Sequence, residues 1–254
     1  MAERLSGLNA IVTGAGSGIG RGVARRFVAE GGNVWFLGRH RENLEDATVG
    51  LGGRAHVLVC DLTDLAALEQ AFHRVPGRLD VVVANAAVQL IGQDARISDV
   101  PPEIWRTTLD INLTGCFHTV RCAVRRMLQQ EPRSGMRGSI IVSGSPTGIT
   151  GEGAGFAAYS ATKAGTHGIA RTTAMDYAKD GIRVNTVIPG HILTPLVDKI
   201  RSDPQAATII DQRIPVGRPG TVEETTGAYV YFASDESAYA TGGMLFVDGG
   251  MSTL

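Results

Sequence analysis

The sequence predicts an α/β protein built on one doubly wound parallel sheet of about seven strands, with helices on both faces. Short runs rich in Val, Ile and Leu recur at strand length, at residues 10–12, 33–37, 55–59, 80–84, 139–142, 183–188 and 244–247. Runs that are apolar on both faces suit parallel strands covered from above and below. The amphipathic stretches between them supply the helical crossovers, and this alternation is typical of a doubly wound sheet.

The chain is expected to form a single domain over residues 1–254. It has 254 residues, of which 43% are hydrophobic and 19% are charged, so there is ample material for a core. No repeat, low-complexity tract or linker interrupts the alternation. The segment at residues 131–137 contains Pro132, Ser134 and Gly135, and it is interpreted as a loop between a helix and a strand.

Composition argues against several classes of protein. The formal net charge of -1 gives no field that would hold a polyanion, so nucleic acid is a poor candidate partner. The three cysteines lack the paired spacing of a metal site and suit core thiols in a reducing compartment. Neither a cleavable apolar leader nor an apolar run of the roughly 18 residues that a membrane span needs is found. A soluble, cytoplasmic protein is therefore expected.

A glycine-rich loop follows the first predicted strand. Residues 13–20 read Thr-Gly-Ala-Gly-Ser-Gly-Ile-Gly, and they open an amphipathic pattern at residues 21–30. Glycines let the backbone turn tightly and approach a pyrophosphate, while the start of a helix offers unpaired N–H groups and the positive end of its dipole. Glycine also serves any sharp turn, so this loop alone is weak evidence for a dinucleotide.

The spacing in this loop departs from G-x-G-x-x-G, because the last position would be Ile19. Gly14, Gly18 and Gly20 instead give T-G-x-x-x-G-x-G, which resembles the short-chain dehydrogenase/reductase family. The resemblance covers nearly the whole chain in the family's order. Its further elements are Asp61, Asn85-Ala86-Ala87, Asn112, Ser145, Tyr159, Lys163, Asn185, Pro189-Gly190, Thr194, Thr241-Gly242 and Asp248-Gly249-Gly250.

The resemblance implies a Rossmann-type fold and an NAD(P)-dependent oxidoreductase that exchanges a hydride with a carbonyl or secondary alcohol. It implies that Ser145 hydrogen-bonds the reacting oxygen, that Tyr159 exchanges its proton, that Lys163 orients the ribose and lowers the phenol's pKa, and that Asn112 holds a water linking Lys163 to solvent. No metal is required. The implied cofactor-binding residues are Gly14, Ser17, Gly18, Ile19, Gly20, Arg39, Asp61, Asn85, Tyr159, Lys163, Pro189, Gly190, Ile192 and Thr194.

The chain departs from the family pattern in two places. After the fourth strand the usual Asn-Asn-Ala-Gly reads Ala84-Asn85-Ala86-Ala87, which puts methyl groups where glycine is common. Ser145 lies 14 residues before Tyr159, where the family more often has 13. Ser143 is therefore an alternative catalytic serine.

A tyrosine and a lysine four residues apart can do proton chemistry on their own account. Tyr159 and Lys163 lie within a helical pattern at residues 156–178, so they share one face about one turn apart. A nearby ammonium favours an ionised phenol, so the pair can supply a proton donor or acceptor near neutral pH. His191 is a candidate substrate contact, whereas His40, His56 and His167 are interpreted as incidental.

The end of the second strand bears on cofactor choice. An acidic residue there would bind the ribose hydroxyls of NAD, but Gly38 takes its place and Arg39 follows, which favours NADP. Ser17 argues the other way, since NADP-preferring relatives often have a basic residue there, so NAD stays possible. Residues 192–215 mix apolar and charged side chains and predict a lid over the substrate, whose identity the sequence does not choose.

Two readings from other classes stay open. A dinucleotide-sensing regulator would keep the glycine loop without needing the catalytic groups, and a Rossmann-like methyltransferase would have no use for the Tyr/Lys pair. The helix at residues 156–178 lacks a broad polar face, which indicates burial on several sides. A homo-oligomer is therefore expected, and by resemblance a tetramer.

Overall fold

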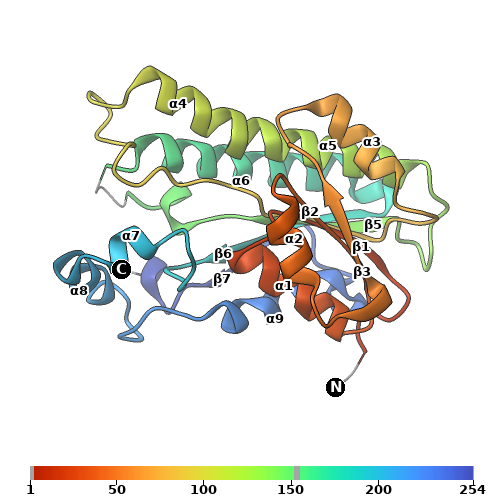
Figure 1. The fold of residues 1–254 in the computed structure, drawn as a ribbon. Coiled ribbons are helices and arrows are strands. Elements are labelled where there is room, and N and C mark those ends of the chain that lie inside the picture. The colour runs from red at the N-terminus through yellow and green to blue at the C-terminus, as the bar shows by residue number, and fades with distance from the viewer. Residues whose placement is uncertain (1–2, 152–154, 254) are drawn as a thin grey trace.

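Seven parallel strands form one sheet in the order β3-β2-β1-β4-β5-β6-β7 (Figure 1). The computed structural model describes residues 3–151 and 155–253. The strands confirm the predicted runs to within a residue or two. They are β1 Asn9–Thr13, β2 Asn33–Gly38, β3 Ala55–Val59, β4 Val81–Ala84, β5 Gly138–Ser143, β6 Ile182–Pro189 and β7 Met244–Val247.

The direction in which the chain builds the sheet reverses beside β1. From β1 the chain adds β2 and β3 on one side, then returns so that β4 pairs with the other side of β1. Ala10 thus lies opposite Val34 of β2 and Val81 of β4. In an open parallel sheet the crevice at such a switch point, outside the carboxyl ends of the strands, is where ligands bind.

Helices cover both faces of the sheet (Figure 1). One face carries α1 Gly18–Ala29, α2 Arg41–Thr48 and α9 Val222–Ala233. The other carries α3 Leu65–His73, α5 Gly115–Leu128 and α6 Ala157–Tyr177, with α4 Pro102–Thr108 packed against α6. Two short helices, α7 Asp198–Arg201 and α8 Pro204–Asp211, lie apart from these layers. The predicted doubly wound α/β fold is confirmed.

Alternate residues of the inner strands enter the two cores. Ile11 packs into the cluster that includes Leu68 of α3 and Val120 of α5. Its neighbour Val12 packs on the opposite side, with Phe27 of α1 and Tyr229 of α9. Successive side chains of a strand point to opposite faces, so a strand buried on both sides must be apolar at every position. This requirement is why the strands read as continuous apolar runs.

Within the described residues, no helix combines the length and the apolar character that crossing a membrane would need.

The three cysteines, Cys60, Cys116 and Cys122, are buried and free. Burial raises the pKa of each thiol, to about 11 for Cys60 and Cys122 and to about 12 for Cys116. They pack as small apolar side chains.

Candidate active site

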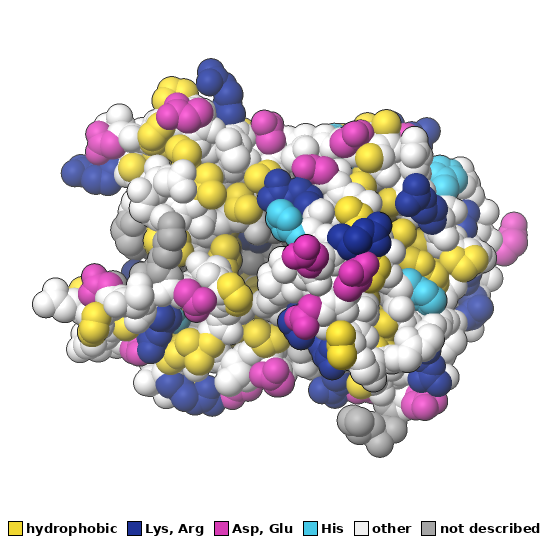
Figure 2. Space-filling model, viewed as in Figure 1, with side chains coloured by type: hydrophobic (Ala, Val, Ile, Leu, Met, Phe, Trp, Pro, Cys, Tyr) yellow, Lys and Arg dark blue, Asp and Glu magenta, His cyan; other side chains and the backbone are white. Residues whose placement is uncertain are grey.

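A cavity of about 960 Å³ opens at the carboxyl ends of the strands. Its walls come from the glycine loop after β1, from the segments after β2 to β6, and from the α7–α8 region. Figure 2 shows the molecule hollowed between the upper helices and the projecting α7–α8 segment, with hydrophobic side chains along the hollow. The cavity therefore lies where the topology predicts a ligand.

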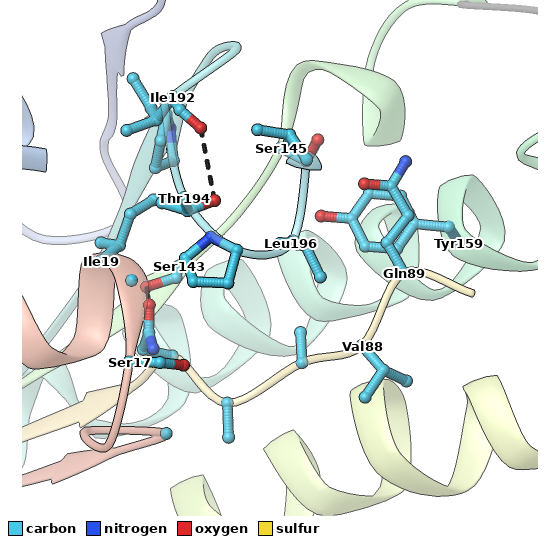
Figure 3. Close-up of a pocket in the computed structure, with 18 of the residues that line it drawn as sticks. Ser17, Ile19, Val88, Gln89, Ser143, Ser145, Tyr159, Ile192, Thr194 and Leu196 are labelled. Carbon is cyan, nitrogen blue, oxygen red and sulfur yellow. Dashed lines mark hydrogen bonds between the residues drawn. The ribbon is translucent and has the colours of Figure 1, made fainter. Parts of the chain in front are cut away.

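The glycine loop is packed too tightly for side chains. Gly14 has a φ of +67°, and a Cβ on it would lie 2.9 Å from the Cα of Ala86. A Cβ on Gly20 would collide with the Gly14 carbonyl. Ser17 precedes α1 but makes no side-chain cap, so the first N–H groups of the helix are left for another acceptor. This cradle fits a pyrophosphate, and Ser17, Gly18 and Ile19 line the cavity beside it (Figure 3).

Asn85 joins three strands at the switch point. Its carboxamide nitrogen donates to the Thr13 carbonyl at 3.1 Å, and its oxygen accepts from Ser143 Oγ at 3.1 Å. The amide thus braces the glycine loop as well as lining the cavity. Ala86, whose N–H donates to Thr13 Oγ1, and Ala87 both have negative φ, so the turn accepts methyl groups where the family often has glycine.

Arg39 and Asp61 flank the cavity at the carboxyl ends of β2 and β3. Arg39 Nη1 lies 3.9 Å from Asp61 Oδ2, and the two side chains are 49% and 45% exposed. Burial would raise the pKa of Asp61, but hydrogen bonds from Thr63 and the charge of Arg39 outweigh it and lower that pKa. The arginine is thus loosely held by one carboxylate and can turn toward another anion.

Helix α6 brings Tyr159 and Lys163 into the cavity from one buried face. Lys163 Nζ donates to the Ser143 carbonyl at 2.8 Å and lies 5.7 Å from the centroid of the Tyr159 ring. The start of the helix is fixed by Asp94, whose two oxygens accept from the N–H groups of Ala158 and Tyr159 at 3.1 and 3.0 Å. Asp94 was not predicted, because its segment is remote from α6 in sequence.

The structure separates the two candidate serines. Ser145 lines the cavity, and its hydroxyl lies beside the Tyr159 hydroxyl (Figure 3). Ser143 also lines the cavity, but its hydroxyl donates to Asn85 Oδ1 and lies 2.8 Å from the Tyr229 hydroxyl of α9. The geometry therefore favours Ser145 as the serine beside the reacting atom. Tyr229 was not predicted, since nothing in the sequence links α9 to β5.

Burial dominates the ionisation of the tyrosine and the lysine. It raises the pKa of Tyr159 to about 12, although the neighbouring Ser145 side chain lowers that pKa. It lowers the pKa of Lys163 to about 8. Lys163 Nζ is bonded to the Ser143 carbonyl and lies 5.7 Å from the centroid of the Tyr159 ring. The lowering of the phenol's pKa by Lys163, which the resemblance implies, stays a prediction.

Asn112 sits in a π-helical segment, Leu109–Thr114, between α4 and α5. Its carboxamide accepts from the Val88 N–H and donates to the Val88 carbonyl, both at 2.8 Å, and it also donates to Thr162 Oγ1 at 3.2 Å. It therefore ties the loop after β4 to α6. Single π turns within helices are frequent at functional sites. The role of Asn112 in a water link to Lys163 stays a prediction.

The segment after β6 closes the far side of the cavity. Pro189, Gly190, Ile192 and Thr194 all line it, and their contact with the cofactor stays a prediction. Thr194 donates to the Ile192 carbonyl at 3.3 Å and packs beside Gly18 of the glycine loop (Figure 3). The loop after β6 and the loop after β1 thus meet across the mouth of the cavity.

The segment predicted as a lid carries α7 and α8. Its Leu196 and Ile209 line the cavity and are 39% and 60% exposed, while Arg201 pairs with Asp211 at 2.8 Å. His191 lies on the same wall, and its buried Nε2 has no hydrogen-bond partner among the described residues. Burial, followed by the charge of Arg201, lowers the pKa of His191.

The interpretation of His167 as incidental, made from the sequence, is wrong. It is buried on α6, and its Nε2 accepts a hydrogen bond from the Ser145 N–H at 3.3 Å. The missed signal is its spacing, since it follows Tyr159 and Lys163 at the same four-residue interval.

Comparison with known proteins agrees with this site. The family model described as "Enoyl-(Acyl carrier protein) reductase" matches residues 14–252. A 3-oxoacyl-[acyl-carrier-protein] reductase of Thermotoga maritima is 35% identical, covering 98% of this chain and 99% of its own. A 3beta-hydroxysteroid dehydrogenase 1 of Eggerthella lenta is 36% identical, covering 99% of this chain and 96% of its own.

The chain belongs to the short-chain dehydrogenase/reductase family. A gluconate 5-dehydrogenase from Burkholderia cenocepacia, solved in complex with NADP and tartrate, superimposes with a TM-score of 0.90 at 30% identity. The match covers 99% of this chain and 98% of that one. The predicted class, an NAD(P)-dependent oxidoreductase acting on CH–OH or C=O groups, is confirmed, and no comparison favours a regulatory protein without turnover.

Proposed function

We propose that this chain transfers a hydride between NADP(H) and a carbonyl or secondary alcohol substrate, with Tyr159 as proton donor and acceptor. The observation that carries the proposal is the placement of the Tyr159 and Ser145 hydroxyls side by side in a cavity that also contains a pyrophosphate cradle. When bound, the nicotinamide supplies or accepts the hydride. The protein supplies position and protons.

Residues at the carboxyl ends of the strands would hold the dinucleotide. The cradle around Gly14, Ser17 and Gly20 would hold the pyrophosphate, and Arg39 would bind a 2′-phosphate on the ribose. Lys163, one turn from Tyr159, is placed to bind the second ribose while it keeps its bond to the Ser143 carbonyl. The wall formed by Pro189, Gly190, Ile192 and Thr194 would cover the nicotinamide end.

Proton transfer is assigned to Tyr159 because its hydroxyl faces the cavity while its ring is buried. In reduction, the hydroxyl donates its proton to the oxygen that forms on the substrate, and Ser145 shares that oxygen through a hydrogen bond. In oxidation, the phenolate accepts the proton of the alcohol. A pKa of about 12 keeps the phenol protonated at neutral pH and so favours the donor role for the groups as they stand.

We expect the α7–α8 wall of the cavity and the segment after β4 to determine which substrate binds. The side chains that face the cavity there are largely apolar, among them Val88, Ile91, Leu196, Ile209 and Ile210. Named activities of the relatives span 3-oxoacyl thioesters, a hydroxysteroid and gluconate. The experiment is absorbance at 340 nm with NADPH and NADH against a panel of these classes and their reduced partners. A complete absence of turnover with every class would contradict an oxidoreductase of this kind.

We also propose that the protein forms a homotetramer and that it acts in the cytoplasm. Two helices that pack together, α5 and α6, leave Phe117, Leu128 and Met175 exposed at 48%, 40% and 84%. Large apolar side chains on a helix pair favour a partner subunit over water. Three buried free thiols suit a reducing compartment. Light scattering at micromolar concentration tests the assembly.

A further inference from the structure

A histidine lies directly beneath the loop that carries the candidate catalytic serine. His167 follows Tyr159 and Lys163 along α6, and all three side chains lie on the buried face of that helix. Its Nε2 accepts from the Ser145 N–H at 3.3 Å, and His167 and Ser145 are 1% and 7% exposed. His167 does not line the cavity, so it touches the serine from behind.

The serine loop is shaped around this imidazole. A Cβ on Gly144 would collide with His167 Nε2, and a Cβ on Gly148 would lie 2.8 Å from its Cε1. The two glycines flank Ser145, so the ring is enclosed on both sides of the serine. Between them, Ser145 begins a 3₁₀ turn over Pro146–Gly148, and its Oγ accepts from the Thr147 N–H. The loop and the ring therefore fit as one packed unit.

The imidazole is held in its neutral form. Burial, followed by the charges of Lys163 and Arg171, lowers the pKa of His167 to about 4. A neutral imidazole accepts at one nitrogen and donates at the other, so acceptance at Nε2 places the proton on Nδ1. An imidazolium would present an N–H to the Ser145 N–H, and the contact would be lost.

We propose that neutral His167 is a positioning residue for this enzyme. It fixes the backbone at Ser145, and through that backbone it keeps the Ser145 hydroxyl beside the Tyr159 hydroxyl. The inference rests on the proposed function, in which Ser145 and Tyr159 share the reacting oxygen. Because His167 meets neither substrate nor dinucleotide, its loss should lower kcat and leave dinucleotide affinity unchanged.

A double-mutant cycle tests whether His167 acts through Ser145. With the best substrate of the carbonyl panel, His167→Leu should lower kcat about tenfold, the weight of one buried hydrogen bond. His167→Gln, whose amide oxygen can reach the place of Nε2, should restore kcat to within about threefold of wild type. In a Ser145→Ala background, His167→Leu should change kcat less than about twofold, because interacting residues are not additive. Equal losses in both backgrounds would overturn the proposal.

A second measurement does not depend on turnover. Long-range ¹H–¹⁵N spectra of the histidines should show His167 neutral, with its proton on Nδ1, at pH 7. Hydrogen exchange at the Ser145 amide should be slow in wild type and His167→Gln and faster in His167→Leu. An Nε2–H tautomer, or an unchanged exchange rate, would refute the contact even if no panel substrate reacts. If His167→Leu does not fold, His167→Asn, whose amide ends short of the serine, replaces it.

Discussion

Cofactor choice can be changed at the end of β2. Gly38 leaves room beside the cavity and Arg39 is loosely held, so we expect NADPH to bind more tightly than NADH. A charge-assisted bond to a phosphate contributes about 1.5–3 kcal/mol. The Arg39 side chain is 49% exposed, which favours the low end, and its pair with Asp61 at 3.9 Å costs up to about 1 kcal/mol to give up. The net contribution is then about 0.5–1.5 kcal/mol, and the preference should be about two- to tenfold.

The perturbation is Gly38→Asp. Its Cβ would lie 3.3 Å from Leu44 Cδ2, so the end of that side chain must shift by a few tenths of an ångström. The φ at Gly38 is not positive, so the backbone accepts a side chain without strain. The new carboxylate would accept from the ribose hydroxyls of NADH and repel the phosphate of NADPH. We expect the preference to invert.

The assay is a fluorescence titration of both reduced cofactors at low and high salt. Arg39→Ala should weaken NADPH binding about two- to tenfold and leave NADH binding unchanged, and salt should reduce the wild-type preference. Arg41→Ala is the matched control, because Arg41 pairs with Glu45 on the exposed side of α2 and does not line the cavity. Equal wild-type affinities, or the same loss in both arginine variants, would refute the reasoning.

Three further outcomes are expected. Tyr159→Phe should abolish turnover with unchanged cofactor affinity, since only the exchangeable proton is lost. Lys163→Ala should impair both turnover and cofactor binding. A kcat of a tenth or more of the wild-type value in Tyr159→Phe would contradict the assignment of proton transfer to Tyr159. Hydrogen bonds from Arg4 and Arg26 outweigh burial and lower the pKa of the buried Glu30 from 4.5 to about 2, so its stabilisation is full above pH 4.5 and is lost as the pH falls toward 2. Urea unfolding of Glu30→Gln should show a loss of about 2 kcal/mol at pH 7 that shrinks at pH 3. Light scattering should give four times the mass of one chain, and a monomeric mass would contradict a subunit interface at the exposed apolar side chains of α5 and α6.

The sequence predicts elements and motifs well where the cause is local. Seven apolar runs mark seven strands because burial on both faces demands them, and the spacing of Tyr159 and Lys163 suffices to put them on one helix face. Contacts between segments that are remote in sequence could not be predicted in this way. Asp94 caps α6 from 64 residues away, and the Tyr229 hydroxyl meets Ser143 across 86. Nothing in the sequence brings those pairs together before the fold does.

The uncertain serine shows how the fold resolves what spacing leaves open. The extra residue relative to the usual interval falls between Ser145 and Tyr159, yet the serine stays beside the tyrosine. Its position is set from another direction, because α6 holds the peptide groups on both sides of Gly144: Lys163 Nζ binds the Ser143 carbonyl, and His167 Nε2 binds the Ser145 N–H. The same helix carries the tyrosine, so one rigid element determines the distance between the two hydroxyls. The length of the connecting loop is then free to vary, and counting residues along it cannot identify the serine.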